Sequence, residues 1–401
     1  MRVVLAPDKF RGSLSASEVC IHLARGLTAV APSVELTTIA VADGGEGTLE
    51  AAFGAGFAAV PARAGGPTGE PVNTRYARRG DVAIVELAAA CGLALLPGGR
   101  PAPLTASSRG AGELVAAALD AGCRTVVLGL GGSASTDGGA GLLRALGAEV
   151  RRADGTPVAD GGAALAEAAG LDLTGLHPAL ARARLLVAAD VDSPLCGPGG
   201  AAALYAPQKG ASAADVAGLD VALTRWADLV EAQLGTSAAG DRSRVAPGAG
   251  AAGGVGFAAL AVLGASIRPG IDVVLELVGL ASRLTGARLV ITGEGAMDRQ
   301  SLHGKAAVGV AAAARRAGVP TVAVCGRLAV SAADLRAAGI DAVYPLADFE
   351  PDLARGLARA GALVEEAARR VAAEWLLDTP RPQGSVPATG PAEDEGRGGD
   401  R

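Results

Sequence analysis

The sequence predicts an α/β protein of two domains, one built around a mostly parallel sheet and the other inserted into it and built around a mixed sheet. Short apolar runs alternate with Ala- and Leu-rich helical patterns almost throughout, which is typical of strand–helix units around a parallel sheet. The chain has 401 residues, more than the ~250–300 at which one hydrophobic core usually stops growing. Only 2% of the residues are aromatic and 59 are glycine, so we expect a core of Ala, Val and Leu with glycine at tight turns.

The first strand–helix unit begins at the N-terminus. Residues 3–6 form an apolar strand, and Ser15 and Glu18 have the spacing of a capping box at the start of a helix. Apolar side chains then recur at helical spacing over residues 19–30. Further apolar runs predict strands at 35–42, 82–87, 125–130, 185–189, 288–292, 321–325 and 342–346.

The middle of the chain has a different pattern. Two extended runs between residues 71 and 87 surround a turn at 78–81, which predicts a hairpin rather than a crossover. Long helical patterns follow at 213–234 and 257–284, and strand–helix alternation then resumes until a last helix at 353–377. We therefore expect one domain over residues 1–75 and 285–378, an inserted domain over 76–284, and a disordered tail over 379–401, where little is apolar.

Charge and cysteine content exclude several classes of protein. The formal net charge is −5, and Lys and Arg occur singly or in pairs, so we expect no nucleic-acid partner. The five cysteines are widely separated, with no C-x-x-C pair, which favours free thiols and a cytoplasmic location. Residues 245–267 are uncharged but contain Pro247 and several glycines, so we expect no membrane association through a spanning helix.

Five turns with carboxylates next to glycines or hydroxyls follow predicted strands. Ligands of open α/β sheets bind beyond the carboxyl ends of the strands, so these turns are where a site is expected. Phosphoryl transfer needs this combination: backbone N–H groups for phosphate, acidic oxygens for Mg²⁺ and a group that activates a hydroxyl. One such turn alone is as well explained by ordinary turn chemistry, so their number favours a site. They cover residues 7–13, 42–47, 129–139, 190–195 and 292–298.

The glycine loop at 129–139 has a second interpretation. The run Gly-x-Gly-x-x-Ala that begins at Gly129 fits the fingerprint of a dinucleotide-binding loop, and Glu149 follows at about the required 20 residues. However, Glu149 precedes a charged segment at 151–154 instead of ending an apolar strand. A nicotinamide-dependent oxidoreductase is therefore the alternative interpretation.

The common catalytic motifs are absent from the sequence. Gly304 and Lys305 are followed by Ala306, so they do not complete a P-loop, although Lys305 opens a predicted helix and can neutralise phosphate there. No nucleophile elbow or Cys/His constellation is visible. Because no histidine is convincingly placed as a base, a carboxylate is expected in that role.

Seven motifs, in order along the chain, carry a family resemblance. They are A-P-D-K-F-R-G-S-L-S-A, A-D-G-G-E-G-T, G-L-G-G-S-A-S-T-D-G-G-A-G, D-V-D-S-P-L-C-G-P-x-G, P-Q-K-G-A, P-G-A-G-A-A-G-G-x-G and I-T-G-E-G-x-x-D-x-Q-S-L-x-G-K. Together they resemble the bacterial type-two glycerate kinases, collinearly from residue 1 to about 378. Lys9 and Arg11 stand where Ser and Lys are more usual in that family, which bears on fine substrate preference rather than on the reaction.

The resemblance implies a two-domain α/β enzyme, with one Rossmann-like domain, that transfers the γ-phosphate of ATP to D-glycerate, commonly at the 2-hydroxyl. ATP and Mg²⁺ are the expected cofactors, and the expected form is a monomer or homodimer. A non-catalytic sugar-acid-binding regulator is a further alternative, but such a protein would need a DNA-reading module, and no basic helix-turn-helix pattern is visible.

Roles can be assigned within these motifs on physical grounds. Lys9 and Arg11 are candidates for the glycerate carboxylate, Arg11 by a two-pronged hydrogen bond, and Lys9 is also a catalytic candidate. Asp190 is the expected base. The other substrate-binding candidates are Asp8, Ser13, Glu294 and Asp298. The ATP-binding candidates are Gly131, Gly132, Ser133, Asp137, Gly253, Gly254 and Lys305. The Mg²⁺ candidates are Asp43, Glu46 and Asp192.

Overall fold

A parallel five-stranded sheet forms the centre of the first domain. The computed structural model describes residues 1–235 and 243–377, so the predicted tail lies outside the described residues. The strand order is β13-β12-β11-β1-β2, and Val3 of β1 lies opposite Leu289 of β11. Both ends of the chain therefore contribute strands to one sheet. Its strands are β1 (Arg2–Pro7), β2 (Glu35–Thr38), β11 (Leu289–Met297), β12 (Thr321–Leu328) and β13 (Ala342–Pro345).

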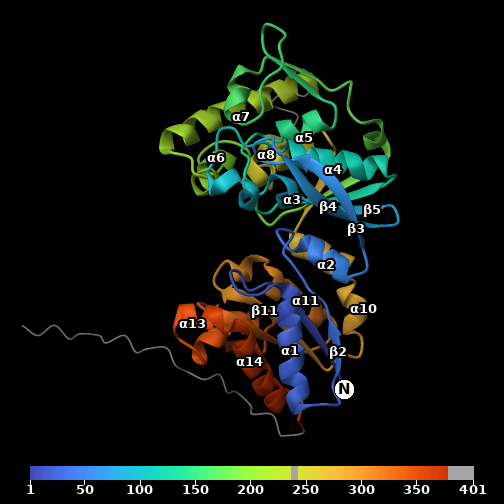
Figure 1. Cartoon of the computed structure of the whole chain (residues 1–401), viewed down its shortest axis with the longest axis vertical. Helices are drawn as coiled ribbons and strands as arrows, with labels where there is room; N and C mark the ends of the chain where they lie inside the picture. The colour runs from blue at the N-terminus through green and yellow to red at the C-terminus, as the bar shows by residue number, and fades with distance from the viewer. Residues whose placement is uncertain (236–242, 378–401) are drawn as a thin grey trace, which may run out of the picture.

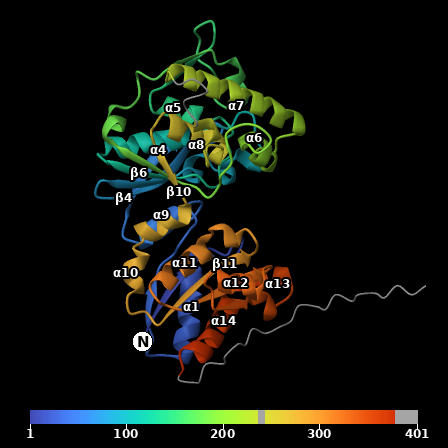
Figure 2. The ribbon, with the colours of Figure 1, turned by 180° about the vertical axis from the view of Figure 1, so that it is seen from behind.

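Helices cover both faces of this sheet. Helices α1 (Ala16–Val30) and α14 (Ala360–Trp375) pack together on one face through an apolar core. The predicted capping box of α1 is confirmed, because Glu18 N–H donates to Ser15 Oγ and Ser15 N–H donates to Glu18 Oε2. The other face is covered by α9 (Gly270–Leu277), α10 (Leu280–Leu284) and α11 (Ala306–Arg316). Helices α12 (Ala332–Ala337) and α13 (Leu353–Ala358) lie beside the same sheet (Figures 1 and 2).

The second domain contains a mixed six-stranded sheet in the order β10-β9-β6-β5-β4-β3. Strands β3, β4 and β5 pair antiparallel, and the remaining pairs are parallel. The predicted hairpin around 78–81 is confirmed, with Arg79 opposite Val82. The fold class predicted from the sequence is therefore confirmed. The strands are β3 (Ala58–Gly65), β4 (Pro71–Arg79), β5 (Val82–Glu86), β6 (Thr125–Gly129), β9 (Arg184–Ala188) and β10 (Ser266–Arg268).

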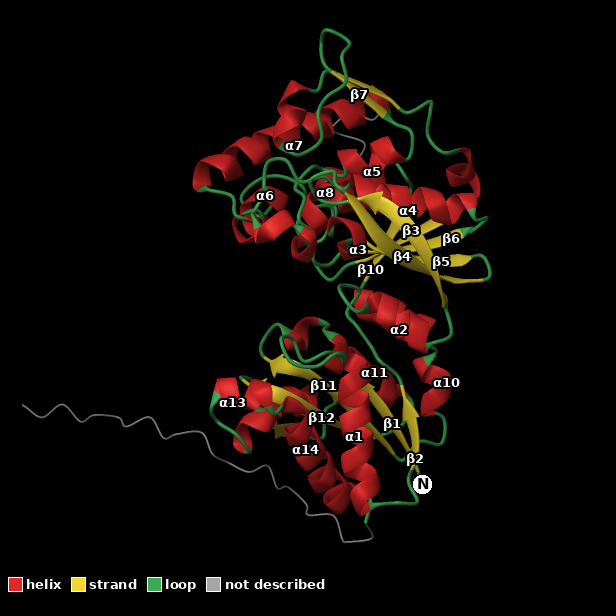
Figure 3. Ribbon diagram, in the orientation of Figure 1, coloured by secondary structure: helices red, strands yellow, loops and turns green. Residues whose placement is uncertain are grey.

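The helices of the second domain gather on one face of its sheet, around a core that includes Trp226 (Figure 3). The indole of Trp226 is fully buried and donates from Nε1 to Gly138 O at 3.0 Å. A short antiparallel pair, β7 (Glu149–Arg151) and β8 (Gly170–Asp172), stands apart from both sheets. The helices are α3 (Ala88–Cys91), α4 (Arg109–Asp120), α5 (Ala140–Ala145), α6 (Ala201–Tyr205), α7 (Ala213–Gln233) and α8 (Ala251–Ala261).

The prediction of one helix over residues 257–284 is wrong. The segment is divided into α8, β10, α9 and α10. Strand β10 pairs with β9, so sheet pairing overrides the local helical pattern there. Gly264 and Gly279 have φ of 61° and 64°, which breaks the helical path on both sides of α9.

Helices α2 (Thr48–Gly54) and α9 lie between the two sheets (Figures 1 and 2). In α9, Val273 packs in a cluster with residues of the second sheet, while its neighbour Val274 packs in a cluster with residues of the first. The predicted boundary between residues 75 and 76 falls inside β4, a strand of the second sheet. Along the described residues, no helix has the length and apolar character needed to cross a membrane.

Candidate active site

A cavity of about 640 Å³ opens between the two domains. It lies where β1, β11 and β12 end, and the glycine loop that follows β6 closes one side of it. This position beyond the carboxyl ends of parallel strands is the one expected for a ligand in an open α/β sheet. Of the residues predicted for the site, the lining includes Asp8, Lys9, Arg11, Ser13, Asp43, Glu46, Gly131, Gly132, Glu294, Asp298 and Lys305.

The loop after β1 carries the first group of these residues. An isolated bridge between Phe10 and Leu14 folds this loop back on itself. Ser13 Oγ donates to Phe10 O at 3.0 Å, so its hydroxyl is used within the loop. Lys9 Nζ donates to Glu46 O and lies 3.4 Å from Glu46 Oε2. Lys9 therefore ties the loop after β1 to the turn that precedes α2.

Carboxylates crowd the centre of the cavity. Burial, the nearby Asp43 charge and, to a smaller extent, Glu294 raise the pKa of Asp8 to about 7. Burial also raises the pKa of Glu294, and its Oε1 has no hydrogen-bond partner among the described residues. Lys305 Nζ lies 4.0 Å from Glu294 Oε2 and 3.6 Å from Asp298 Oδ1. This part of the cavity can accept a metal ion, or another cationic group, that separates its negative charges.

The glycine loop approaches the first domain closely. A Cβ on Gly131 would come 2.4 Å from Gly45 Cα, and one on Gly129 would come 2.5 Å from Gly44 O. Only glycine allows this approach between the two backbones. Next in the chain, Ser133 turns inward and its Oγ accepts a 2.9 Å hydrogen bond from Lys209 Nζ. Gly131 and Gly132 therefore face the cavity, whereas Ser133 does not line it.

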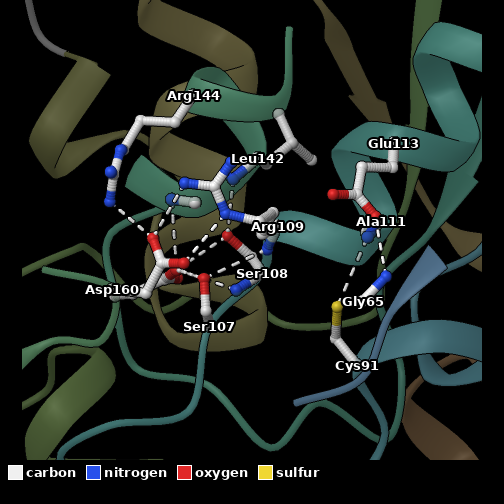
Figure 4. A network of polar contacts seen from close by, with 12 residues as sticks. Gly65, Cys91, Ser107, Ser108, Arg109, Ala111, Glu113, Leu142, Arg144 and Asp160 are labelled. Carbon is white, nitrogen blue, oxygen red and sulfur yellow. Dashed lines mark hydrogen bonds and ion pairs between the residues drawn. The ribbon is translucent and has the colours of Figure 1, made fainter. Parts of the chain in front are cut away.

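Asp137 is fully buried behind the glycine loop and does not line the cavity. Its Oδ2 accepts hydrogen bonds from Ser108 N at 2.8 Å, Ser108 Oγ at 2.9 Å and Gly141 N at 3.2 Å. Burial raises the pKa of Asp137, and these hydrogen bonds oppose that rise. Ser107 and Ser108 continue into a partly buried network in which Asp160 pairs with Arg109 and Arg144 (Figure 4). Asp137 therefore holds the loop to the start of α4.

Gly253 and Gly254 also lie behind the glycine loop. They have φ of 68° and 97° within a kink of α8. A Cβ on Gly253 would come 2.2 Å from Ser135 O, and one on Gly254 would come 2.7 Å from Gly138 Cα. These two glycines pack against the loop backbone and do not line the cavity.

Asp190 and Asp192 follow β9, and neither lines the cavity. Asp190 Oδ1 accepts a hydrogen bond from Gly270 N at 2.8 Å. Although the residue retains exposed surface, partial burial of its carboxyl, with smaller contributions from the Asp43 and Asp272 charges, raises the pKa of Asp190 to about 7. Asp192 is exposed. Asp190 thus interacts electrostatically with a residue that lines the cavity, Asp43.

The carboxylates of the cavity fit a Mg²⁺ ion that is bound partly by phosphate and water better than a metal ion that is bound by protein side chains alone. Within the described part of the chain, no group of three or more His, Cys, Asp or Glu side chains is arranged to hold a metal ion. Mg²⁺ commonly binds through one or two carboxylates together with phosphate oxygens and water. Asp43 and Glu46 line the cavity and can supply such oxygens.

Two features of the site were missed by the sequence interpretation. Lys209 is 3% exposed and donates to Ser133 Oγ and to Ser135 O, and burial lowers its pKa to about 8. Its only signal was its place in the P-Q-K-G-A motif, to which no role was given. Leu353 and Leu357 of α13 also line the cavity. In the sequence they had the helical spacing of ordinary core residues.

The fold and the cavity together define a two-domain α/β enzyme whose site combines cationic side chains, carboxylates and a glycine loop. Residues 3–376 match the model of the glycerate kinase family. The chain therefore belongs to that family, which confirms the predicted kinase class. A glycerate kinase of Bacillus subtilis (strain 168) is 41% identical over 380 residues, covering 94% of this chain and 98% of the relative.

Two further comparisons agree with this assignment. A glycerate 2-kinase of Escherichia coli (strain K12) is 40% identical over 347 residues, covering 86% of this chain and 90% of the relative. The crystal structure of a proposed glycerate kinase 2 from Salmonella typhimurium LT2 is similar with a TM-score of 0.80 at 41% identity, covering 93% of this chain and 97% of that one. The predicted family resemblance is confirmed over nearly the whole described chain.

Proposed function

We propose that this chain transfers the γ-phosphate of ATP to D-glycerate, at the 2-hydroxyl, to give 2-phosphoglycerate and ADP. Family membership supports the reaction class, and the name of the Escherichia coli relative supports the position of transfer. The observation that carries the proposal is the joint presence of cationic and acidic side chains with a glycine loop in one interdomain cavity. Phosphoryl transfer depends on positioning and on charge stabilisation by such groups.

The substrate acid is assigned to the loop after β1. Lys9 and Arg11 bind its carboxylate, and Arg11, which is exposed and lines the cavity, is free to form a two-pronged contact. Asp8, Ser13, Glu294 and Asp298 surround the rest of this small ligand. Lys9 also neutralises negative charge close to the transferred group, which is its catalytic role in this proposal.

The triphosphate is assigned to Lys305 and to the backbone N–H groups of Gly131 and Gly132, all of which line the cavity. Ser133, Asp137, Gly253 and Gly254 act behind the loop, where their contacts fix its conformation. Mg²⁺, when bound at Asp43 and Glu46, with Asp192 proposed as a further ligand, would supply neutralisation of the phosphate charge. This fits the crowded carboxylates, since the Asp43 charge contributes to the raised pKa of Asp8.

Asp190 is assigned as the base that accepts the proton of the glycerate hydroxyl. Its pKa of about 7 is close to the value at which a general base works best near neutral pH. Its electrostatic partner Asp43 lines the cavity, so the carboxyl of Asp190 is close to the region assigned to the reacting groups.

The alternative oxidoreductase is disfavoured by the position of Glu149. A dinucleotide site requires an acidic residue at the end of a strand that neighbours the glycine loop's own strand. Glu149 lies instead in β7, whose partner is β8, while the neighbours of β6 are β5 and β9. We also place the enzyme in the cytoplasm and assign it no nucleic-acid partner. The five free cysteines, four of them buried, support a reducing compartment.

A coupled assay of ADP release tests this proposal. We expect ADP release from ATP only when D-glycerate is present, with 2-phosphoglycerate as product by NMR. We expect EDTA to abolish the release and added Mg²⁺ to restore it. Nicotinamide cofactors should have no effect. Hydride transfer to or from NAD(P) with a small hydroxy acid, without ADP release, would refute the kinase assignment.

A further inference from the structure

The cavity is larger than a small acid requires. Its volume of about 640 Å³ lies within the range of about 300–1,000 Å³ that is typical of pockets for much larger organic ligands. The residues assigned above to glycerate and phosphate come from the strand ends and the glycine loop. Another part of the lining, residues 346–363, comes from the segment after β13 and the first turn of α14, and it has a different chemical character.

That second part of the cavity is largely apolar. Four leucines contribute to it, and we call them the leucine wall: Leu346, Leu353, Leu357 and Leu363. Leu346 and Leu363 also belong to the core of the first domain, so the wall rests on a rigid base. Leu353 and Leu357 are 51% and 43% exposed on consecutive turns of α13. Exposed leucines that line a cavity are typical of a ligand surface.

The cationic side chains that line the cavity are confined to one part of it, and they set the direction of an elongated ligand. Glu350 and Asp352 line the cavity next to the leucine wall. Asp352 caps α13 by accepting from Arg355 N at 2.8 Å, and Glu350 lies 3.6 Å from Arg359 Nη1. Both of these carboxylates are also within 4 Å of an arginine, Arg355 or Arg359. The lysines and arginines that line the cavity are Lys9, Arg11, Lys305 and Arg327, all in its strand-end part, so a triphosphate is attracted there and not to the wall. A ligand with one flat apolar end and one anionic end fits this arrangement.

We propose that the leucine wall binds the adenosine part of ATP, with the triphosphate extending past Lys305 towards Gly131. The inference rests on the proposed function and assigns the nucleoside subsite within it. The flat face of the base packs on Leu353 and Leu357, since apolar and aromatic surfaces form most of the lining of such pockets. Figure 3 shows α13 next to the ends of β11 and β12. Lys305, in the segment that follows β11, lines the same cavity as Leu353 and Leu357 of α13.

The test is calorimetric titration of the full chain with ADP and, separately, with inorganic tripolyphosphate. In the double variant Leu353→Ser/Leu357→Ser we expect ADP to bind at least about tenfold more weakly, because apolar contact area is lost. Tripolyphosphate affinity should stay within about twofold. The KM for ATP should rise in parallel with the ADP dissociation constant, while the KM for D-glycerate and kcat stay near wild type.

The matched control is Leu204→Ser on α6. Leu204 is 50% exposed but does not line the cavity, so this variant should bind ADP as wild type does, and equal melting temperatures will show that all variants are folded. ADP binding unchanged in the double variant, or absent from wild type, overturns the subsite. If ADP binds the leucine wall but glycerate is not phosphorylated, the subsite stands and the proposed reaction is the part that fails.

Discussion

At the scale of single residues, Asp190 and Asp8 are two carboxyls with raised pKa values near the same cavity. Both have a pKa of about 7, mainly through burial and with a contribution from the Asp43 charge. Of the two, Asp8 lines the cavity and Asp190 does not. Only one of them needs to accept the substrate proton. Mutation of each residue in turn can decide which of the two carboxyls accepts the proton.

Asp190→Asn should lower kcat by about 10²–10⁴ with little change in KM, because the amide keeps the shape of the side chain but cannot accept the proton. A base must be deprotonated, so wild-type kcat should fall as pH drops below about 7, and this limb should disappear in the variant. Steady-state kinetics from pH 5.5 to 9 measure both effects.

The control for this variant is Asp272→Asn, because Asp272 is an exposed acid whose charge acts on Asp190. It should retain turnover within about threefold of wild type. Turnover of Asp190→Asn within threefold of wild type, with loss in Asp8→Asn, would transfer the role of base to Asp8. A raised Mg²⁺ requirement that extra metal rescues would instead make Asp190 a metal ligand.

Lys209 should make stability depend on pH. Burial lowers its pKa from 10.5 to about 8, so the folded state binds fewer protons than the unfolded state between these values. Stability then rises with pH across that window, by on the order of 1–3 kcal/mol. Lys209→Met should remove this rise. The free energy of unfolding of the variant, relative to that of wild type, should therefore be higher at pH 7 than at pH 10. Urea unfolding at both pH values measures it.

Ser133→Ala is the control for that experiment. It removes one hydrogen bond to the amine, at a cost of about 1 kcal/mol, but it keeps the titrating group. Its stability should therefore still rise with pH as in wild type. A wild-type rise that survives unchanged in Lys209→Met would show that other groups cause it.

At the scale of elements, the ends of the strands could be predicted from the sequence, but which of the turns after them lie together around one cavity could not. Apolar runs and glycine-rich turns mark each strand locally, so the order of strands and the turns after them were visible. Which turns share a cavity depends on how α2 and α9 place the two sheets, and this packing has no local signal. Residues 190–195 and the region of Gly253 were therefore grouped with the site, although neither lines the cavity.

The burial of individual polar residues could not be predicted from local sequence patterns either. Asp137 had the appearance of a phosphate-loop residue, because Asp next to Gly is common in such turns. Its hydrogen bonds with Ser108 come from the start of α4, a contact that spacing alone does not reveal. Lys209 is buried for the same kind of reason, through Ser133 and Ser135 from a distant loop.

The contact between the glycine loop and the turn before α2 gives a prediction at this scale. Gly131→Ala would place a Cβ 2.4 Å from Gly45 Cα, so one backbone must shift, at a cost of about 1–3 kcal/mol. Because Gly131 also faces the proposed phosphate site, kcat/KM for ATP should fall at least tenfold. Thermal melts and steady-state kinetics measure the two losses.

Gly218→Ala is the matched control. Gly218 lies in α7, and a Cβ there would meet no atom within 4 Å, so alanine should be neutral or slightly stabilising in the helix. If Gly131→Ala behaves like Gly218→Ala in both measurements, the close approach of the two backbones is not maintained in solution.

At the scale of the whole molecule, the two domains share a continuous apolar junction. Adjacent residues of α9 pack towards different sheets, and α2 fills the same junction. The cavity draws its lining from both sides of this junction. Ligand geometry therefore depends on the relative position of the domains, and changes in α2 or α9 should alter the site without touching a ligand.

The position of β1 in the first sheet has a consequence for synthesis of the protein on the ribosome. Strand β1 lies between β2 and β11, and Val3 must pair with Leu289. Translation proceeds from the N-terminus, so β1 emerges long before its partner β11 exists. The strands of the second sheet, from β3 to β10, are all made within that interval. The inserted domain is thus the first that can complete its sheet, while the apolar first strand stays without its partner and requires protection from aggregation until late in translation.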